Sequence, residues 1–363
     1  MSNQSNLRVT VTDHNQKSDP VLTTLAETTQ RNRVVDVASR LAEMRDWLRN
    51  DLVELEEGLS HIVQDPQADL AWAAAEYLLQ KAGKRVRPIC VMLAAQMSDR
   101  AFDHEVKQVA ICAELVHTAT LMHDDVIDQG EDRRGRPTAR MVYGNAASVL
   151  GGDHLLVDAL QRVHSTNPAL TGSLLGVIAD MVHAEALQLE LRKSFRPDRN
   201  LYQQVVEGKT AALFRWALES GGQLGNLAPE QATLLGEVGA NLGMTFQLID
   251  DKLDLCGSPE ETGKDTCLDL REGKLTWPLI LAAERSPSLL LRLRHIAGSD
   301  HDPKVGEIAQ MVEEIRNTGA IEDTQAEAER FAQLAANALK KLPSGRARDA
   351  LQAVIQTALH RSR

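Results

Sequence analysis

The chain has 363 residues, 43% of them hydrophobic and 25% charged, so it can bury a core and does not have the composition of a disordered protein. Its 51 acidic and 40 basic residues give a formal net charge of −11, which argues against a nucleic-acid-binding protein, because such proteins present a basic face. The aromatic content of 3% argues against a β-sandwich or barrel, and the four cysteines lack the Cys-x-x-Cys spacing of a zinc knuckle.

The N-terminus is polar and has neither a helical apolar period nor the apolar segment of a signal peptide, so residues 1–32 are predicted to form a flexible tail. No change of composition marks a linker between residues 33 and 363, and one domain is expected there. Apolar residues recur in this part at steps of three and four, the period of an amphipathic α-helix. The pattern starts at Val34 and returns in 70–81, 102–128, 147–163, 170–195, 201–223, 232–255, 273–284, 305–317 and 320–340.

Proline interrupts this pattern where helices are expected to begin or end, as at Pro168, Pro197, Pro229 and Pro287. No sustained alternating run between hairpin turns indicates a strand. No apolar run reaches the roughly 18 residues that a membrane span needs. We therefore predict an all-α, single-domain protein that is soluble and cytoplasmic.

Two of the predicted helices carry the same acidic pattern, Asp-Asp-x-x-Asp, each time after an apolar stretch. Residues four apart lie about 40° apart around an α-helix, so each pattern projects at least two carboxylates from one face. Carboxylates on an apolar face repel one another and favour a bound cation, whereas a solvated acidic patch is not expected twice in matching apolar settings. The candidate metal ligands are Asp124, Asp125, Asp128, Asp250, Asp251 and Asp254.

Oxygen ligands without clustered His or Cys favour Mg²⁺, which shares its coordination with substrate phosphates. Short basic clusters that could bind phosphate lie at residues 84–87, at residues 133–136, and at Lys209 and Lys264. Arginine binds phosphate through two parallel hydrogen bonds, and lysine adds a point charge. Short basic clusters beside acidic ones in an acidic chain indicate an anionic substrate bridged by metal.

The order of these motifs resembles that of the trans-type polyprenyl diphosphate synthases. Residues 114–138 and 246–280 resemble the two aspartate-rich regions of that family, and residues 83–88, 144–153 and 207–214 match its intervening blocks. The resemblance covers about residues 72–281. It implies a helical bundle of the isoprenoid-synthase type around a central cavity.

The resemblance also implies an activity: a Mg²⁺-dependent prenyltransferase that condenses isopentenyl diphosphate with an allylic diphosphate to give a long-chain trans-polyprenyl diphosphate. Farnesyl diphosphate is the expected allylic substrate, and the cofactor is expected to be three Mg²⁺ ions bridged by diphosphate. A homodimer is expected, with no nucleic-acid partner and at most peripheral membrane contact for product release.

Individual roles follow from the same resemblance. Lys84, Arg87, His117 and Arg134 would hold the diphosphate of isopentenyl diphosphate. Arg133, Lys209, Thr210, Gln247 and Lys264 would hold the allylic diphosphate, and the catalytic group would be Asp124, Asp128, Asp250 and Lys209. The chain departs from the usual family pattern beside these positions, at Ala82, Asp265 and Cys267, which puts loop geometry in doubt more than activity.

Product length is expected to depend on the helix that carries the first acidic motif. Short-chain members of the resembled family have bulky aromatic residues four or five positions before this motif, where this chain has Thr120 and Ala119. Thr120 and Val116 lie about 40° and 80° from Asp124 around a helix, so both could line a channel for the growing chain. Small residues here predict a long product, although close helix packing would also explain them.

Four other functions share some of these features. A shorter-chain synthase differs only in product length. A terpene cyclase would normally replace the second acidic motif, and a non-catalytic partner subunit would tend to lose these motifs. A di-iron bundle needs two Glu-x-x-His pairs, and the chain has Glu114-x-x-His117 but only Asp180-x-x-His183 as the second.

Overall fold

The computed structural model describes residues 35–62, 69–80, 83–133, 135–192, 195–256, 267–298 and 305–361, and the tail predicted for residues 1–32 lies outside them. The described residues are almost entirely helical, which confirms the all-α prediction. The helices are α2 (Val35–Ser60), α3 (Leu70–Leu79), α4 (Val86–Ala95), α5 (His104–Ile127), α6 (Ala139–Tyr143), α7 (Asn145–Thr166), α8 (Thr171–Arg192), α9 (Arg199–Val206), α10 (Ala212–Leu224), α11 (Pro229–Cys256), α13 (Leu268–Arg271), α14 (Trp277–Arg285), α15 (Pro287–Ala297), α16 (Val305–Asn317), α17 (Ala320–Leu339) and α18 (Arg346–His360), with 3₁₀ turns η1 (Gln96–Ser98) and η2 (Pro168–Leu170) and a π-helical turn η3 (Glu207–Ala211).

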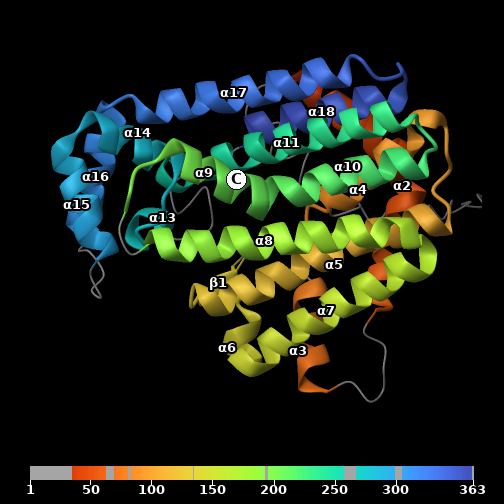
Figure 1. Ribbon diagram of the computed structural model, residues 1–363, viewed down its shortest axis with the longest axis horizontal. Helices are drawn as coiled ribbons and strands as arrows, with labels where there is room; N and C mark the ends of the chain where they lie inside the picture. Colours follow the sequence, from red (N-terminus) through yellow and green to blue (C-terminus); the bar gives the residue numbers. More distant parts are fainter. Residues whose placement is uncertain are drawn as a thin grey trace, which may run out of the picture.

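The long helices lie side by side in one bundle, with α8, α10, α11 and α17 running along its length (Figure 1). Helix α4 lies inside this bundle against α5, α10 and α18, and all its residues from Pro88 to Ala95 are buried. Gly221 allows α10 to approach α4 closely, because a Cβ atom there would lie 2.5 Å from the carbonyl oxygen of Val91. This close packing fixes the helices that border the cavity described below.

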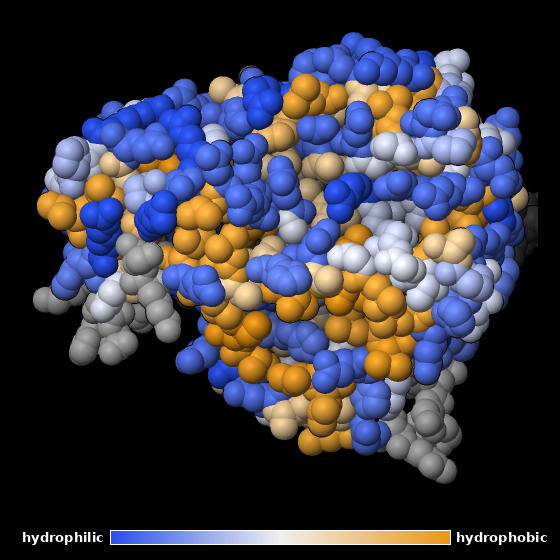
Figure 2. All heavy atoms as spheres, viewed as in Figure 1, coloured by the Kyte–Doolittle hydropathy of each residue, from blue (hydrophilic) through white to orange (hydrophobic). Residues whose placement is uncertain are grey.

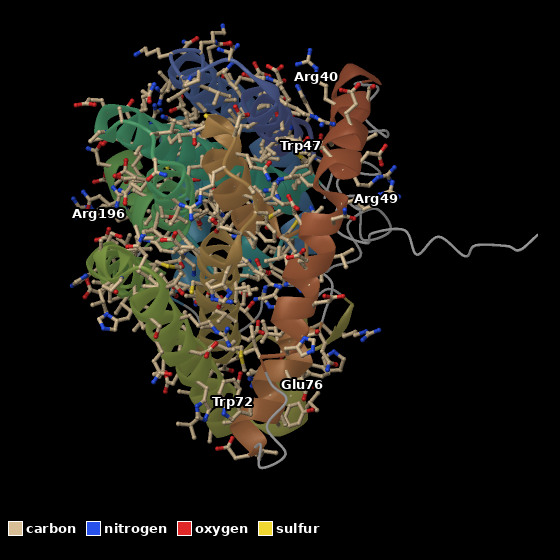
Figure 3. All side chains as sticks on the ribbon, turned by 90° about the vertical axis from the view of Figure 1, so that its right-hand side faces the viewer. Arg40, Trp47, Arg49, Trp72, Glu76 and Arg196 are labelled. Atoms are coloured by element: carbon tan, nitrogen blue, oxygen red, sulfur yellow. The ribbon has the colours of Figure 1, made fainter. Side chains whose placement is uncertain are left out.

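Helix α2 lies along one side of the bundle, where Arg49 points away from the other helices (Figure 3). Its apolar stripe is buried from Leu41 to Leu59, as the sequence period predicts; Leu48 and Leu55 have no exposed surface. Trp47 lies on the side toward α18, where the guanidinium of Arg346 is 4.8 Å from its ring centroid. Helix α2 therefore packs against α18 at the side of the bundle.

Local sequence explains where many helices begin. The Asp69 carboxylate accepts hydrogen bonds from the backbone N–H groups of residues 71 and 72 at the start of α3, and Asp103 and Asp198 cap α5 and α9 in the same way. Pro229 and Pro287 occupy the first position of their helices, where the missing N–H has no helical partner to lose. These starts match the breaks expected from the sequence.

Three local features differ from the sequence prediction. Strands β1 (Asp132–Arg133) and β2 (Arg136–Pro137) form a hairpin after α5, too short to show an alternating pattern. The helix expected over 201–223 is interrupted by the π-helical turn η3. Helices α4, α6, α13, α15 and α18 were not among the predicted ranges.

One helical stretch, Pro168–Arg192, is long and apolar enough to cross a membrane by length and composition alone, contrary to the expectation from the sequence. In the structure this stretch is η2 and α8, which pack against α7, α9, α10 and η3. Part of its apolar surface lines the cavity, through Ile178 and Met181. Its apolar character thus has a role within the bundle.

A buried hydrogen-bond network joins α11 to α9 and α14. The Asp251 carboxylate, 2% exposed, accepts hydrogen bonds from the Tyr202 hydroxyl at 2.7 Å, the Trp277 backbone N–H at 3.1 Å and the Gln247 amide at 2.9 Å. Burial, and then the negative charge of Asp269, raise the pKa of Asp251 to about 7. Asp251 therefore acts as a structural acceptor that holds three segments together.

We expect Asp251→Ala to lower the free energy of unfolding by roughly 2–4 kcal/mol, because it leaves buried O–H and N–H donors without acceptors. Tyr202→Phe removes one hydrogen bond and should cost only about 1 kcal/mol. Denaturant unfolding followed by circular dichroism measures both. The control is Asp180→Ala, which removes only an exposed ion pair with Arg215. An Asp251→Ala protein as stable as this control would contradict the structural role of the network.

Candidate functional site

A cavity of about 950 Å³ lies between α4, α5, α7, α8, η3 and α11. Its lining combines charged groups with apolar side chains, so it can hold a molecule with an anionic end and a hydrocarbon end. The apolar part comes mainly from α7 and α8. The lining there consists of Leu156, Ile178, Met181, Val182, Ala186 and Leu189.

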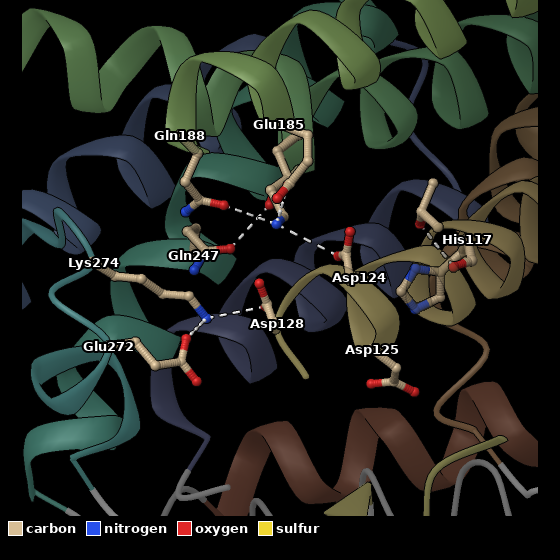
Figure 4. Close-up of polar contacts among 12 residues, drawn as sticks. His117, Asp124, Asp125, Asp128, Glu185, Gln188, Gln247, Glu272 and Lys274 are labelled. Atoms are coloured by element: carbon tan, nitrogen blue, oxygen red, sulfur yellow. Dashed lines mark hydrogen bonds and ion pairs between the residues drawn. The ribbon is translucent and has the colours of Figure 1, made fainter. Parts of the chain in front are cut away.

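The first acidic motif lies at the C-terminal end of α5, where Asp124 and Asp128 face cations of the chain (Figure 4). The Asp124 carboxylate is 3.5 Å from Lys209 Nζ; burial raises the pKa of Asp124, although Lys209 opposes this effect. Asp128 is 2.5 Å from Arg192 Nη2 and 3.3 Å from Lys274 Nζ. Burial would raise the pKa of Asp128, but Lys274 and Arg192 outweigh it and the pKa is lowered.

The middle aspartate of this motif has a different environment. Asp125 follows Asp124 by one position, about 100° around the helix, and points away from it (Figure 4). Its carboxylate is 3% exposed and lies 2.7 Å from Arg133 Nη2 on β1. Asp125 thus fixes the hairpin that follows α5, and it keeps Arg133 at the cavity lining.

The second acidic motif lies in the last two turns of α11, and its aspartates also differ from one another. Asp250 lines the cavity and is 2.6 Å from Arg361 Nη2, whereas Asp251 belongs to the buried network. Asp254 accepts hydrogen bonds from the backbone N–H groups of Leu268 and Asp269 at 3.0 and 3.2 Å. Burial and the charge of Asp269 raise the pKa of Asp254 to about 7.

Four of the basic and polar residues predicted to bind substrate come from α4 and the segment just before it, from α5 and from α11. Lys84, Arg87, His117 and Gln247 all line the cavity. The neighbouring Arg85 has another role: it is 4% exposed, and pairs with Glu56 and Glu114 on α2 and α5.

The π-helical turn η3 brings Lys209 and Thr210 to the cavity lining together. Lys209 donates to Glu185 and, at 2.9 Å, to Gln188 on α8. Gly208 permits this contact between η3 and α8, because a Cβ atom there would lie 2.8 Å from a backbone oxygen of α8. Such π-helical turns are often found at functional sites.

The structure separates the residues predicted to limit product length. Thr120 lines the cavity four residues before Asp124, whereas Ala119 and Val116 have no exposed surface and pack in the core. Arg134 and Lys264 lie outside the described residues.

Five side chains that contact the predicted site were not expected from the sequence. Each makes an ion pair or hydrogen bond with a motif residue, and only Lys274 lies within a block that resembles the family, residues 246–280. A charge in an otherwise apolar helix was the available signal for Glu185 on α8, and the neutral Gln188 gave none. The five residues are Glu185, Gln188, Arg192, Lys274 and Arg361.

Within the described residues, no three acidic, His or Cys side chains converge to form a metal site by themselves. The carboxylates of Asp124 and Asp250 nevertheless line one cavity and are the oxygen donors that Mg²⁺ prefers. Mg²⁺ commonly uses one or two carboxylates and completes its coordination with substrate phosphates. The donor set therefore fits a Mg²⁺–phosphate complex better than a free metal ion.

Comparison with known proteins agrees with this reading. The family model described as polyprenyl synthetase matches residues 69–315. The chain is 37% identical over 294 residues to the octaprenyl diphosphate synthase of Escherichia coli, covering 79% of this chain and 88% of that protein. It is 33% identical over 316 residues to "Heptaprenyl diphosphate synthase component 2" of Geobacillus stearothermophilus, covering 86% and 96%.

Solved structures show the same fold. A decaprenyl diphosphate synthase from Rhodobacter capsulatus superimposes with a TM-score of 0.82 at 32% identity, covering 89% of this chain and 99% of that one. A polyprenyl synthase from Caulobacter crescentus, complexed with calcium and isoprenyl diphosphate, also gives 0.82 at 31% identity, covering 88% and 97%. The chain therefore belongs to the polyprenyl synthetase family of prenyltransferases.

Proposed function

We propose that the cavity binds isopentenyl diphosphate and an allylic diphosphate with Mg²⁺, and condenses them into a long-chain trans-polyprenyl diphosphate. The observation that carries this proposal is the position of Asp124 and Asp250, on two different helices, at the lining of one cavity that also has basic and apolar walls. The heptaprenyl, octaprenyl and nonaprenyl synthases among the relatives support a product of the hexaprenyl to decaprenyl class. Farnesyl diphosphate is the proposed primer.

Asp124 and Asp128 on one wall and Asp250 on the other would hold Mg²⁺, and we propose three ions. When bound, Mg²⁺ would neutralise the negative charge that develops on the departing diphosphate. The polyprenyl synthase from Caulobacter crescentus, complexed with calcium and isoprenyl diphosphate, supports the binding of a divalent ion and a diphosphate.

Side chains of the cavity would bind and orient the two substrates and exclude water. Lys84, Arg87 and His117 would orient isopentenyl diphosphate so that its double bond faces the allylic carbon. Lys209 and Thr210 would bind the allylic diphosphate. The apolar residues of α7 and α8 exclude water from the allylic cation. The proton released after the new carbon–carbon bond forms is best accepted by the diphosphate, since none of the described side chains that line the cavity is placed as an obvious base.

The cavity also suggests how long the product can grow. The hydrocarbon tail would extend from the carboxylates past Thr120, a small side chain on the lining, toward Met181 and Ile178. Ala119 and Val116 are packed in the core, so Thr120 is the residue of this group that can limit the tail directly.

Thr120→Phe should shorten the product to farnesyl or geranylgeranyl diphosphate, because the ring would fill the path of the tail one turn of about 5.4 Å below Asp124. Chromatography of the radiolabelled products measures their length. Thr171→Phe is the control, since Thr171 lies at the start of α8 outside the cavity lining. A folded, active Thr120→Phe enzyme with unchanged product would show that the tail takes another path.

Asp124→Asn should reduce turnover by about 10³-fold or more, because the lost charge stabilises the transition state rather than the fold. Steady-state condensation of isopentenyl and farnesyl diphosphates with Mg²⁺ gives the rate. Asp180→Asn, on the outer side of α8, should behave as wild type. Near-normal turnover of Asp124→Asn would contradict the role of the first acidic motif.

We also propose that the chain forms a homodimer through α7 and α8. Apolar side chains gather on this face (Figure 2). They include Val149, Leu150 and Val157 on α7 and Leu175 and Val182 on α8, exposed by 38–63%. A patch of this kind on a soluble protein marks an interaction site.

Leu150→Glu should convert the dimer into a monomer, because it places a charge in the apolar interface. Light scattering after gel filtration measures the mass. The control is Leu291→Glu, which changes a leucine on α15 that is 67% exposed, compared with 54% for Leu150. If the wild-type chain is itself a monomer and inactive alone, the homodimer is wrong and a second subunit is needed, as the name "component 2" of the relatives suggests for them.

A further inference from the structure

Arg361 follows the last helix, α18, and its side chain enters the cavity beside Asp250. The residue is 8% exposed, which is unusual for arginine unless it is paired. It lies on the same side of the cavity as the first basic cluster, because a smaller adjoining pocket is lined by Lys84, Val86, Phe246 and Arg361 together. Arg361 thus lies between a proposed metal ligand and a proposed diphosphate site.

The contacts of Arg361 use only part of its hydrogen-bonding capacity. Nη2 is 2.6 Å from an oxygen of Asp250 and donates to the Phe246 carbonyl at 2.5 Å, and the guanidinium lies 3.6 Å from the Phe246 ring centroid. Nε is buried and has no hydrogen-bond partner among the described residues. A buried donor without an acceptor is costly, so this guanidinium is suited to a further anion.

We propose that Arg361 is an exchangeable counter-ion: in the empty site it neutralises Asp250, and when Mg²⁺ takes Asp250, Arg361 transfers to the diphosphate of isopentenyl diphosphate. This inference rests on the proposed function. It assigns a substrate-binding role to a residue outside the motifs, and it makes the binding of metal and of isopentenyl diphosphate depend on each other.

The physical reason for this dependence is competition for one carboxylate. Metal must displace a buried guanidinium from Asp250, which weakens metal binding to the empty enzyme. The diphosphate of isopentenyl diphosphate can accept several charge-assisted hydrogen bonds from one guanidinium, so it draws Arg361 from Asp250 and frees that carboxylate. By linkage, metal then tightens isopentenyl diphosphate binding by the same factor.

The test is Mn²⁺ binding, followed through the electron paramagnetic resonance signal of free Mn²⁺, with and without isopentenyl diphosphate and with no allylic primer, so that no turnover occurs. In the wild type, isopentenyl diphosphate should tighten Mn²⁺ binding by about tenfold or more. In Arg361→Gln, Mn²⁺ alone should bind several-fold more tightly than in the wild type, and the enhancement by isopentenyl diphosphate should fall to about twofold or less. Arg330→Gln, which removes an exposed ion pair with Glu327, is the control and should match the wild type.

A second variant tests the same exchange by changing Asp250 instead of Arg361. Asp250→Asn releases Arg361 without providing a metal ligand, so isopentenyl diphosphate should bind this variant more tightly than the wild type when both are free of metal, as measured by calorimetry. A purely structural role for Arg361, as a clamp for α18, predicts no such gain. No gain in Asp250→Asn, or an unchanged enhancement in Arg361→Gln, overturns the proposal.

If Arg361→Gln does not fold, Arg361→Lys carries the test. Lysine keeps the charge on Asp250 but cannot bind phosphate with several parallel donors, so the enhancement should fall below that of the wild type, and an unchanged value overturns the proposal. The proposed function is judged separately, by whether the wild-type chain makes polyprenyl product when the primer is added.

Discussion

Carboxylates that lie in an apolar cavity must be neutralised, and the site of this protein is organised around that requirement. The three carboxylates that we propose as metal ligands each face a cation from a different segment: Asp124 faces Lys209, Asp128 faces Arg192, and Asp250 faces Arg361. The same cations are suited to bind phosphate, so the groups that stabilise the empty site are also able to receive a metal–diphosphate complex.

The fold makes this arrangement possible by keeping the two acidic motifs on rigid helices. Helices α5 and α11 both contact α10, and Gly221 brings α10 against α4, which follows the basic cluster containing Lys84. The aspartates that do not face the cavity hold this frame in place. Asp125 binds the hairpin after α5, and Asp251 joins α11 to α9 and α14. Each acidic motif thus contributes aspartates to the site and an aspartate that stabilises the fold around it.

Much of this could be predicted from the sequence, because helical periodicity and four-residue spacing are local properties. The pattern placed Asp124 and Asp128 on one face and marked most helices correctly. It could not distinguish Asp250 from Asp251, since the difference depends on Tyr202 and on the backbone N–H of α14. Arg361 was missed because its partner lies more than a hundred residues earlier in the chain, and η3 because local propensity does not reveal a π-helical turn.

The central claim is that this chain, with Mg²⁺, extends an allylic diphosphate by repeated addition of isopentenyl units. The most direct measurement is the chain length of the products that the purified chain makes from radiolabelled isopentenyl diphosphate and farnesyl diphosphate, with Mg²⁺ and after chelation. The account predicts products of the hexaprenyl to decaprenyl class with Mg²⁺ and none after chelation. A cyclic hydrocarbon product, or elongation that persists without divalent metal, would contradict it.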